Sequence, residues 1–155
     1  MKNIILTVSV IIVLSLSLIS AVYAEPNMEG CNLNGASLQK CDLSGINFKN
    51  ATLRNVNFQK AKLSNTIFNL SILQGSDFRN ANLKGADLSG CDLSSCNFEG
   101  ADLTGAKIGG SNLQNANFKN AILKKVQLSS TVWPNVICPD GTISNENGYS
   151  CEGNQ

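Results

Sequence analysis

Ala81-Asn82-Leu83-Lys84-Gly85-Ala86-Asp87-Leu88-Ser89-Gly90 consists of two five-residue units with the same pattern. In each unit a small residue is followed by Asn or Asp and then by a large apolar residue. The pattern continues without a break from Cys31 to Trp133. Every fifth residue from Leu33 to Trp133 is Leu, Phe, Ile or Trp, and all six Phe of the 155-residue chain fall in this series. Composition alone does not produce such a distribution, so the repeat decides the fold.

A period of five suits neither a long helix nor a long strand. On a helix of 3.6 residues per turn, side chains five apart scatter around the axis. On a flat strand they alternate between the two faces. Within one unit, however, the small and the large residue are two apart, on the same side of an extended backbone. Gly and Asn fill many of the linking positions, where they turn the chain at little steric cost. The sequence therefore predicts a coil with a corner every five residues.

Sorting the large residues at intervals of twenty separates them by type. One series reads Leu38, Phe58, Phe78, Phe98 and Phe118, and another contains only Leu. Stacked coils with four sides would select such series, because like side chains then lie above one another. We therefore predict an all-β solenoid of about five coils, in which the Phe series forms a ladder in the core.

The units Ala81–Gly85 and Ala101-Asp102-Leu103-Thr104-Gly105 resemble the pentapeptide-repeat family, whose consensus is A-(D/N)-L-x-x. The resemblance covers about residues 31–133. It implies a right-handed quadrilateral β-helix, in agreement with the four series of large residues. Members of this family share a shape, and few have a defined activity, so the resemblance constrains function only weakly.

Residues 1–24 predict a signal for export. Lys2 precedes an apolar run that ends in small residues, which is typical of a signal peptide cut between Ala24 and Glu25. The alternative is an uncleaved membrane anchor, since Ile4–Val22 is just long enough to span a bilayer. We expect a periplasmic or secreted protein, with anchoring by the N-terminal segment as the alternative.

Short segments flank the repeats. Residues 25–30 are predicted to form a lead-in that caps the first coil. Pro134 cannot donate a backbone hydrogen bond, so we predict that the repeats stop there and that residues 134–155 form a tail. Cys138 and Cys151 are expected to form a disulfide that pins this tail over the last coil. A metal site is the weaker alternative, because the chain has no His.

The other four cysteines occupy the small position of the repeat. Each is expected to replace Ala as a compact apolar residue. A disulfide between Cys91 and Cys96 is the leading exception. The four are Cys31, Cys41, Cys91 and Cys96.

Residues 31–133 carry eleven Lys or Arg against six Asp or Glu. The best-known activity in the family belongs to acidic rods that mimic DNA and shield gyrase from quinolones. Such mimicry needs a dense negative surface, so the net positive charge of these repeats disfavours it. Binding of nucleic acid by the basic residues is also disfavoured, because the lysines are dispersed along the sequence and no aromatic residues are interleaved among them. These lysines are Lys40, Lys60, Lys62, Lys84, Lys124 and Lys125.

Catalytic chemistry finds little support in the sequence. With no His, acid–base catalysis would fall to carboxylates in the Asn/Asp position of the repeat, where we expect solvated side chains with ordinary pKa values. No nucleophile elbow, phosphate-binding loop or metal-binding cluster is evident. We therefore expect no enzymatic activity, no cofactor, no metal and no small-molecule substrate. The carboxylates are those of Asp42, Asp77, Asp87, Asp92 and Asp102.

The leading hypothesis is an exported, non-catalytic solenoid that presents flat faces to a protein or to a component of the cell envelope. Ile67, Leu70 and Ile72 occupy outward positions and form a candidate patch for a partner or for a second copy of the chain. The alternative for these residues is incidental exposure. The alternative function is a DNA-mimicking inhibitor or protector of topoisomerase (gyrase).

Overall fold

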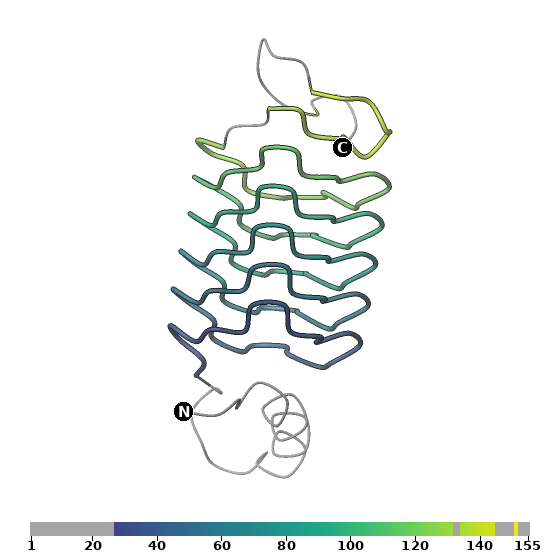
Figure 1. The fold of residues 1–155 in the computed structure, drawn as a ribbon. Coiled ribbons are helices and arrows are strands. Elements are labelled where there is room, and N and C mark those ends of the chain that lie inside the picture. The colour runs from purple at the N-terminus through teal and green to yellow at the C-terminus, as the bar shows by residue number, and fades with distance from the viewer. Residues whose placement is uncertain (1–26, 132–133, 145–150, 152–155) are drawn as a thin grey trace.

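The computed structural model describes residues 27–131, 134–144 and 151. The predicted signal segment, its cleavage point at Ala24–Glu25 and Trp133 lie outside these residues. The described chain forms a stack of coils that begins at Asn27 and ends in a C-terminal hairpin (Figure 1). Over these ranges there is no helix, and each strand is a single bridged residue. Consequently, no described helix could cross a membrane.

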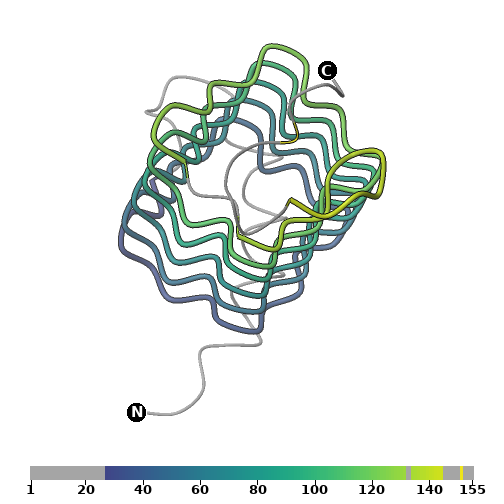
Figure 2. The same cartoon turned by 90° about the horizontal axis from the view of Figure 1, so that it is seen from above.

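The bridges define a strict twenty-residue register. In the repeats every bridge is parallel and joins two residues twenty positions apart, as in Asn57 with Asp77 and Asp77 with Asn97. Four five-residue units therefore complete one coil, and the coils superimpose into a four-sided outline when viewed along the axis (Figure 2). This is the quadrilateral arrangement that the four series of large residues predict. We number the positions of a unit from 1, the small residue, to 5.

Backbone hydrogen bonds join each coil to its neighbours. The N–H groups at positions 2, 3 and 5 donate to carbonyl groups of adjacent coils; Thr52 N, for example, donates to Cys31 O at 2.8 Å. The N–H at position 1 closes the corner by donating to the carbonyl three residues earlier, as Ala51 N does to Phe48 O at 3.0 Å. Position 4 is thus the one place in the unit whose N–H is not used by the backbone ladder.

The Asn or Asp at position 2 fills this gap. Its Oδ1 accepts the N–H of position 4, as Asn57 Oδ1 does from Gln59 N at 3.0 Å and Asp102 Oδ1 from Thr104 N at 3.0 Å. Every N–H of a consensus unit therefore has a partner, which a folded backbone requires. The preference for Asn or Asp in the repeat is accordingly a consequence of turn structure.

Position 5 has a positive φ in every unit from Gly30 to Asn135. Gly and Asn adopt this left-handed conformation readily, whereas other residues do so at a cost of about 1–2 kcal/mol. Leu70, with a φ of 62°, therefore occupies a corner that disfavours it.

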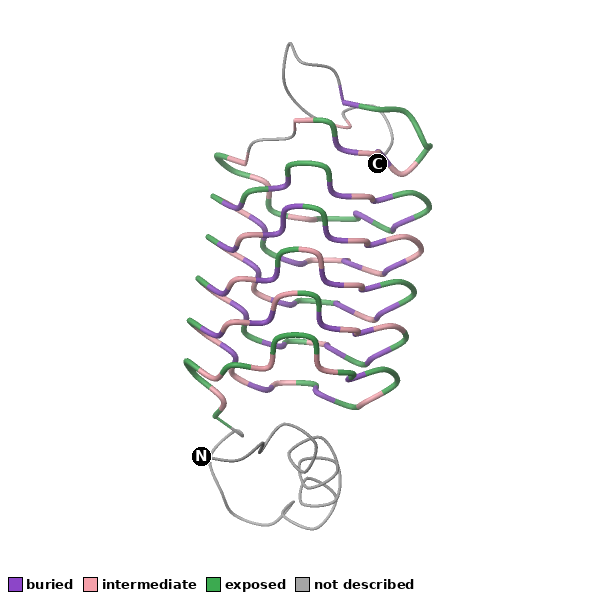
Figure 3. Ribbon diagram, viewed as in Figure 1, coloured by how far each residue is buried: buried purple, intermediate pink, exposed green. Residues whose placement is uncertain are grey.

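Positions 1 and 3 face the interior, which produces the alternation of buried and exposed backbone in Figure 3. The predicted Phe series is fully buried and stacked. Ring centroids are 4.8 Å apart for Phe58 and Phe78, 4.9 Å for Phe78 and Phe98, and 4.8 Å for Phe98 and Phe118. Leu38 lies buried at the start of the same series. The centroid spacing equals the separation of paired strands, so the ladder follows directly from the register.

The small position contains hydrogen bonds that its apolar description overlooks. Ser71 Oγ donates to Phe48 O at 2.6 Å and accepts from Ala51 N at 3.2 Å, so one hydroxyl links two coils. Cys91 Sγ and Cys96 Sγ make the corresponding contacts with carbonyl groups, each at 3.0 Å. The thiols therefore act as weak donors as well as compact filling, which corrects the purely apolar interpretation.

Cys91 and Cys96 are buried and free, so the disulfide considered between them is not formed. Burial raises the pKa of the Cys91 thiol to about 12 and also raises that of Cys96. Cys31 and Cys41, in the first coil, are half-buried and free, and desolvation raises the pKa of each thiol. The buried pair is protonated and poorly reactive at neutral pH.

Both ends of the repeat differ from expectation. Asn27 bridges to Asn47, and Met28 N donates to Asn47 O at 2.7 Å, so residues 27–30 form a regular unit of the first coil rather than a separate lead-in. Pro134 does not stop the repeat, because Asn115 N donates to Pro134 O at 3.0 Å. The prediction was wrong because Pro134 occupies position 4, whose N–H takes no part in the ladder.

A hairpin closes the C-terminal end of the stack. Ile137 bridges in parallel to Asn117 and antiparallel to Ile143, while Ser144 N donates to Val136 O at 2.8 Å. The antiparallel segment thus occupies an edge that another coil would otherwise extend. Cys138 and Cys151 are joined by the expected disulfide, which ties residue 151 to this hairpin.

Candidate interaction surfaces

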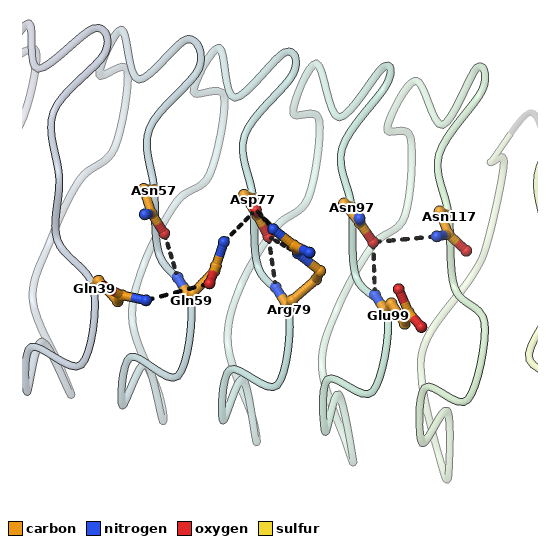
Figure 4. Close-up of polar contacts among 8 residues, drawn as sticks. All are labelled: Gln39, Asn57, Gln59, Asp77, Arg79, Asn97, Glu99 and Asn117. Atoms are coloured by element: carbon orange, nitrogen blue, oxygen red, sulfur yellow. Dashed lines mark hydrogen bonds and ion pairs between the residues drawn. The ribbon is translucent and has the colours of Figure 1, made fainter.

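One side of the rod carries two groups of hydrogen-bonded amides and charges, one from Gln39 to Arg79 and one from Asn97 to Asn117 (Figure 4). Asn117 Nδ2 donates to Asn97 Oδ1 of the previous coil at 3.2 Å. On the same side, Asp77 accepts from Gln59 Nε2 at 2.7 Å and from the Arg79 guanidinium at 2.7–3.1 Å. Within each group the side chains satisfy one another, between coils and within a coil, and they form a plain polar face.

The carboxylates are not simply solvated, which corrects one expectation. A hydrogen bond from the Ser44 hydroxyl, together with the nearby Lys62 ammonium, lowers the pKa of Asp42. Partial burial opposes ionisation of Asp77, but hydrogen bonds from Arg79 and Gln59 outweigh it and lower the pKa of that carboxyl. The pKa of Asp102 falls in the same way, because donors from Thr104 and Lys84 outweigh its partial burial.

These shifts favour the ionised form, whereas a general acid near neutral pH needs a raised pKa. Asp87 and Asp92 also accept the position-4 N–H, from Ser89 at 3.0 Å and from Ser94 at 3.1 Å. The five candidate carboxylates therefore serve turns and ladders, and the structure does not gather them into one site. Within residues 27–131, 134–144 and 151, no group of three or more His, Cys, Asp or Glu could hold a metal ion.

The candidate apolar patch lies around one corner of the rod. Ile67 and Ile72 are the position-2 residues of two adjacent sides, and Leu70 occupies the corner between them. Ile67 is 39% exposed and Leu70 is 54% exposed, while Ile72 is half-buried. The patch therefore consists mainly of two residues. Sequence analysis missed Ile122, which is 50% exposed and is also identifiable as an apolar residue at position 2.

The lysines are not dispersed in space. The twenty-residue register places six of them on one side of the rod and its two bounding corners, which we call the lysine side. The sequence-based interpretation failed because residues far apart in the chain recur at the same edge every coil. The lysine side comprises Lys40, Lys60, Lys62, Lys84, Lys124 and Lys125, all exposed.

Comparisons with known proteins identify the class. A model described as "Pentapeptide repeat region" matches residues 15–88, and one described as "Pentapeptide repeats (8 copies)" matches residues 96–132. The chain belongs to the pentapeptide repeat family. No curated protein matches it in sequence.

Solved structures agree with the fold. The pentapeptide repeat protein Rfr23 from the cyanobacterium Cyanothece 51142 is 25% identical, with a TM-score of 0.67 over 68% of this chain and 85% of that chain. The pentapeptide repeat protein alr5209 from Nostoc Pcc 7120 is 23% identical, with a TM-score of 0.64 over 79% of this chain and 94% of that chain. QnrB1, a plasmid-mediated fluoroquinolone resistance protein, is 17% identical with a TM-score of only 0.32, covering 75% of this chain and 76% of that chain, so it carries no argument about function.

Proposed function

We propose that this protein is an exported, non-catalytic right-handed rod of about five coils, whose flat faces bind another protein or a component of the cell envelope. The proposal combines the solenoid with the predicted signal peptide. The mature chain would begin at Glu25 and act in the periplasm or outside the cell. The alternative localisation is attachment to the membrane by an uncleaved N-terminal segment.

The use of the carboxylates is the observation that carries the non-catalytic role. Asp77 and Asp102 accept hydrogen bonds from their own turns and from neighbouring coils, and their pKa values are lowered. The interior is filled by stacked apolar side chains. A rod of this kind offers regular surfaces for recognition, which is the main use of solenoid proteins.

The corner patch of Ile67 and Leu70 is one candidate contact for a protein partner or a second copy. Leu70 adopts a strained φ of 62° at a corner where Asn50 and Gly90 occupy the neighbouring coils. Residues retained in an unfavourable conformation are candidates for functional positions. The gyrase-protecting alternative is disfavoured, because the repeats from 31 to 133 carry a net positive charge rather than the negative charge of a DNA mimic.

Cell fractionation tests the proposed localisation. Cells expressing the full chain should release a mature form whose N-terminal residue is Glu25, outside the cytoplasm. A matched variant lacking residues 2–24 should remain in the cytoplasm at its full translated length. Recovery of the intact 155-residue chain in the cytoplasm would contradict export and reopen the topoisomerase alternative, which a DNA-supercoiling assay then tests directly.

Cross-linking in the envelope fraction tests the interaction role. The wild-type rod should give discrete cross-linked species, and these should be lost when Ile67 and Leu70 are both replaced by Asn. An Ile143→Asn variant is the control, since Ile143 is also exposed but lies in the C-terminal hairpin. Equal cross-linking of all three proteins would remove the corner patch from the proposal.

A further inference from the structure

We propose that the lysine side is a docking surface for a membrane that contains anionic lipids, to which the rod adsorbs along its length. The inference rests on the proposed non-catalytic, face-presenting role and names the partner of one face. It draws on three features of the described residues: where the charge collects, which cation supplies it and what conformation holds it.

The excess positive charge of the repeats is concentrated on this side. Through the described repeats from Cys31 to Thr131 the lysine side carries six Lys and two Asp, whereas the positive and negative charges on the remaining sides nearly balance. Lys62 pairs with Asp42 at 3.2 Å, and Lys84 pairs with Asp102 at 3.2 Å. Four net positive charges remain on the lysine side. Asp140 of the hairpin lies at the C-terminal end of the corner that contains Lys40 and Lys60.

The cation is always Lys, and both Arg residues lie elsewhere, with Arg54 and Arg79 on two other sides. Arg suits bidentate recognition of a single phosphate, whereas Lys acts as a hydrated point charge on a flexible stem. A flat array of exposed Lys therefore suits a fluid surface of anionic headgroups better than a fixed phosphate pocket. Ile122 projects from the same side and is 50% exposed, as an apolar contact with the headgroup region requires.

The same face fits single-stranded nucleic acid poorly. Binding of that kind uses aromatic side chains on which bases stack. All six Phe are fully buried in the core, and none reaches the lysine side. Nucleic acid is therefore the competing outcome of the test.

Backbone strain supplies an independent indication that these charges are selected. Three of the lysines, Lys40, Lys60 and Lys125, occupy position 5 with φ of 61°, 58° and 58°. These are the only lysines at position 5 in the described repeats, and all three bound the lysine side. Folding favours Gly or Asn there, and the uncharged departures from this preference, Leu70, Ser95 and Ser130, lie at the other two corners. Turn formation therefore does not explain why the strained residues beside this side are basic, whereas a charged edge does.

The strain also allows a variant that removes charge without threatening the fold. Lys40→Asn, Lys60→Asn and Lys125→Asn together remove three charges and install the residue that already occupies many position-5 corners, such as Asn50 and Asn80. The matched control removes three charges from other sides through Lys49→Gln, Lys107→Gln and Lys119→Gln. Circular dichroism and urea unfolding check that both proteins remain folded.

Sedimentation with vesicles measures the effect. Purified protein of residues 25–155 is mixed with vesicles of phosphatidylcholine alone or with about one-third phosphatidylglycerol, at low and physiological salt. Because a Lys near an anionic surface is worth about fivefold in partitioning, the corner variant should lose about 100-fold in affinity for the anionic vesicles, and binding should weaken with salt. The control variant should lose less than about fivefold.

Three results would overturn the proposal: no dependence on phosphatidylglycerol, an equal loss in the two variants, or tighter binding to single-stranded or duplex DNA than to vesicles with the same dependence on the corner lysines. The last result would make the lysine side a nucleic-acid surface. Failure of vesicle binding by a protein that fractionation shows to be exported overturns only the membrane partner. Cytoplasmic retention of the full chain contradicts export and leaves the vesicle result intact.

Discussion

Replacement of Phe98 by Ala tests the central element of the fold. Phe98 has no exposed surface and stacks on Phe78 at 4.9 Å and on Phe118 at 4.8 Å, with ring planes within 6° of parallel. Truncation of a buried Phe to Ala typically costs about 3–5 kcal/mol, part of it from the cavity that remains. Each stacked pair adds about 0.5–1.5 kcal/mol beyond its buried area, and Phe98→Ala interrupts two of them. We therefore expect a loss in the upper part of that range, about 4–5 kcal/mol.

Two further variants separate stacking from general disturbance. Phe98→Leu fills most of the volume again with the residue type of Leu38, the first member of the same series. It should lower the free energy of unfolding by only about 1–2 kcal/mol. Asn97→Ala changes the adjacent outward side chain, which accepts hydrogen bonds from Glu99 N at 3.0 Å and Asn117 Nδ2 at 3.2 Å. Its cost should be about 1 kcal/mol.

Urea unfolding followed by circular dichroism measures these differences, and hydrogen exchange locates the affected coils. Stability in a solenoid is close to a sum of units and their interfaces, so loss of protection should be greatest in the coils around Phe98. A loss below about 1 kcal/mol for Phe98→Ala, or equal losses for Phe98→Ala and Asn97→Ala, would refute the stacked core.

Three other predictions follow from particular contacts. Leu70→Asn should raise the free energy of unfolding by about 0.5–1 kcal/mol, measured by thermal unfolding, because Asn tolerates the positive φ. The same change should weaken any partner contact at that corner. A loss of stability would contradict the strain argument. The lowered pKa of Asp77 contributes stability that is present above the unfolded-state pKa of about 3.9 and is lost as pH falls through the folded-state pKa. Asp77→Asn should therefore flatten the acid limb of the urea midpoint plotted against pH, compared with the wild-type protein, and an unchanged limb would contradict this reasoning. Cys151→Ser should destabilise the C-terminal hairpin by about 3 kcal/mol, because it removes the disulfide with Cys138. Hydrogen exchange should become faster in the hairpin and stay unchanged in the central coils. Global unfolding at the same denaturant midpoint as a central-core variant would contradict this local role.

The interior could be predicted because its side chains obey a simple periodic constraint. Phe58, Phe78 and Phe98 stand twenty residues apart, and only a four-sided coil places them in one column. The chemistry of the small position could not be predicted at the same level. Ser71 and Cys91 look like substitutes for Ala in the pattern, and their bonds to carbonyl groups of the preceding coil depend on where those carbonyls point.

The end of the repeat was misjudged because a general rule was applied without the position. Proline disrupts a ladder where its missing N–H would donate. Pro134 and Pro139 both occupy position 4, where the consensus unit gives the N–H to an Asn or Asp side chain instead. The pattern therefore contained the signal, but its meaning required the hydrogen-bond assignment of the whole unit.

The same distinction separates what folding selects from what it leaves open on the lysine side. Positions 1 and 3 are fixed by packing and position 2 by the turn, so a departure there has a direct structural cost. Position 5 is fixed by φ, and Lys40, Lys60 and Lys125 all depart from its preference on the same side of the rod. Leu70, Ser95 and Ser130 also depart from this preference, but they lie at the two other corners and carry no charge. If turn formation had selected the three lysines, Asn would have served better, and the basic departures would not be confined to the corners of one side. A requirement for charge along that side explains both their identity and their placement, and it implies that the corner variant should gain stability while it loses vesicle binding.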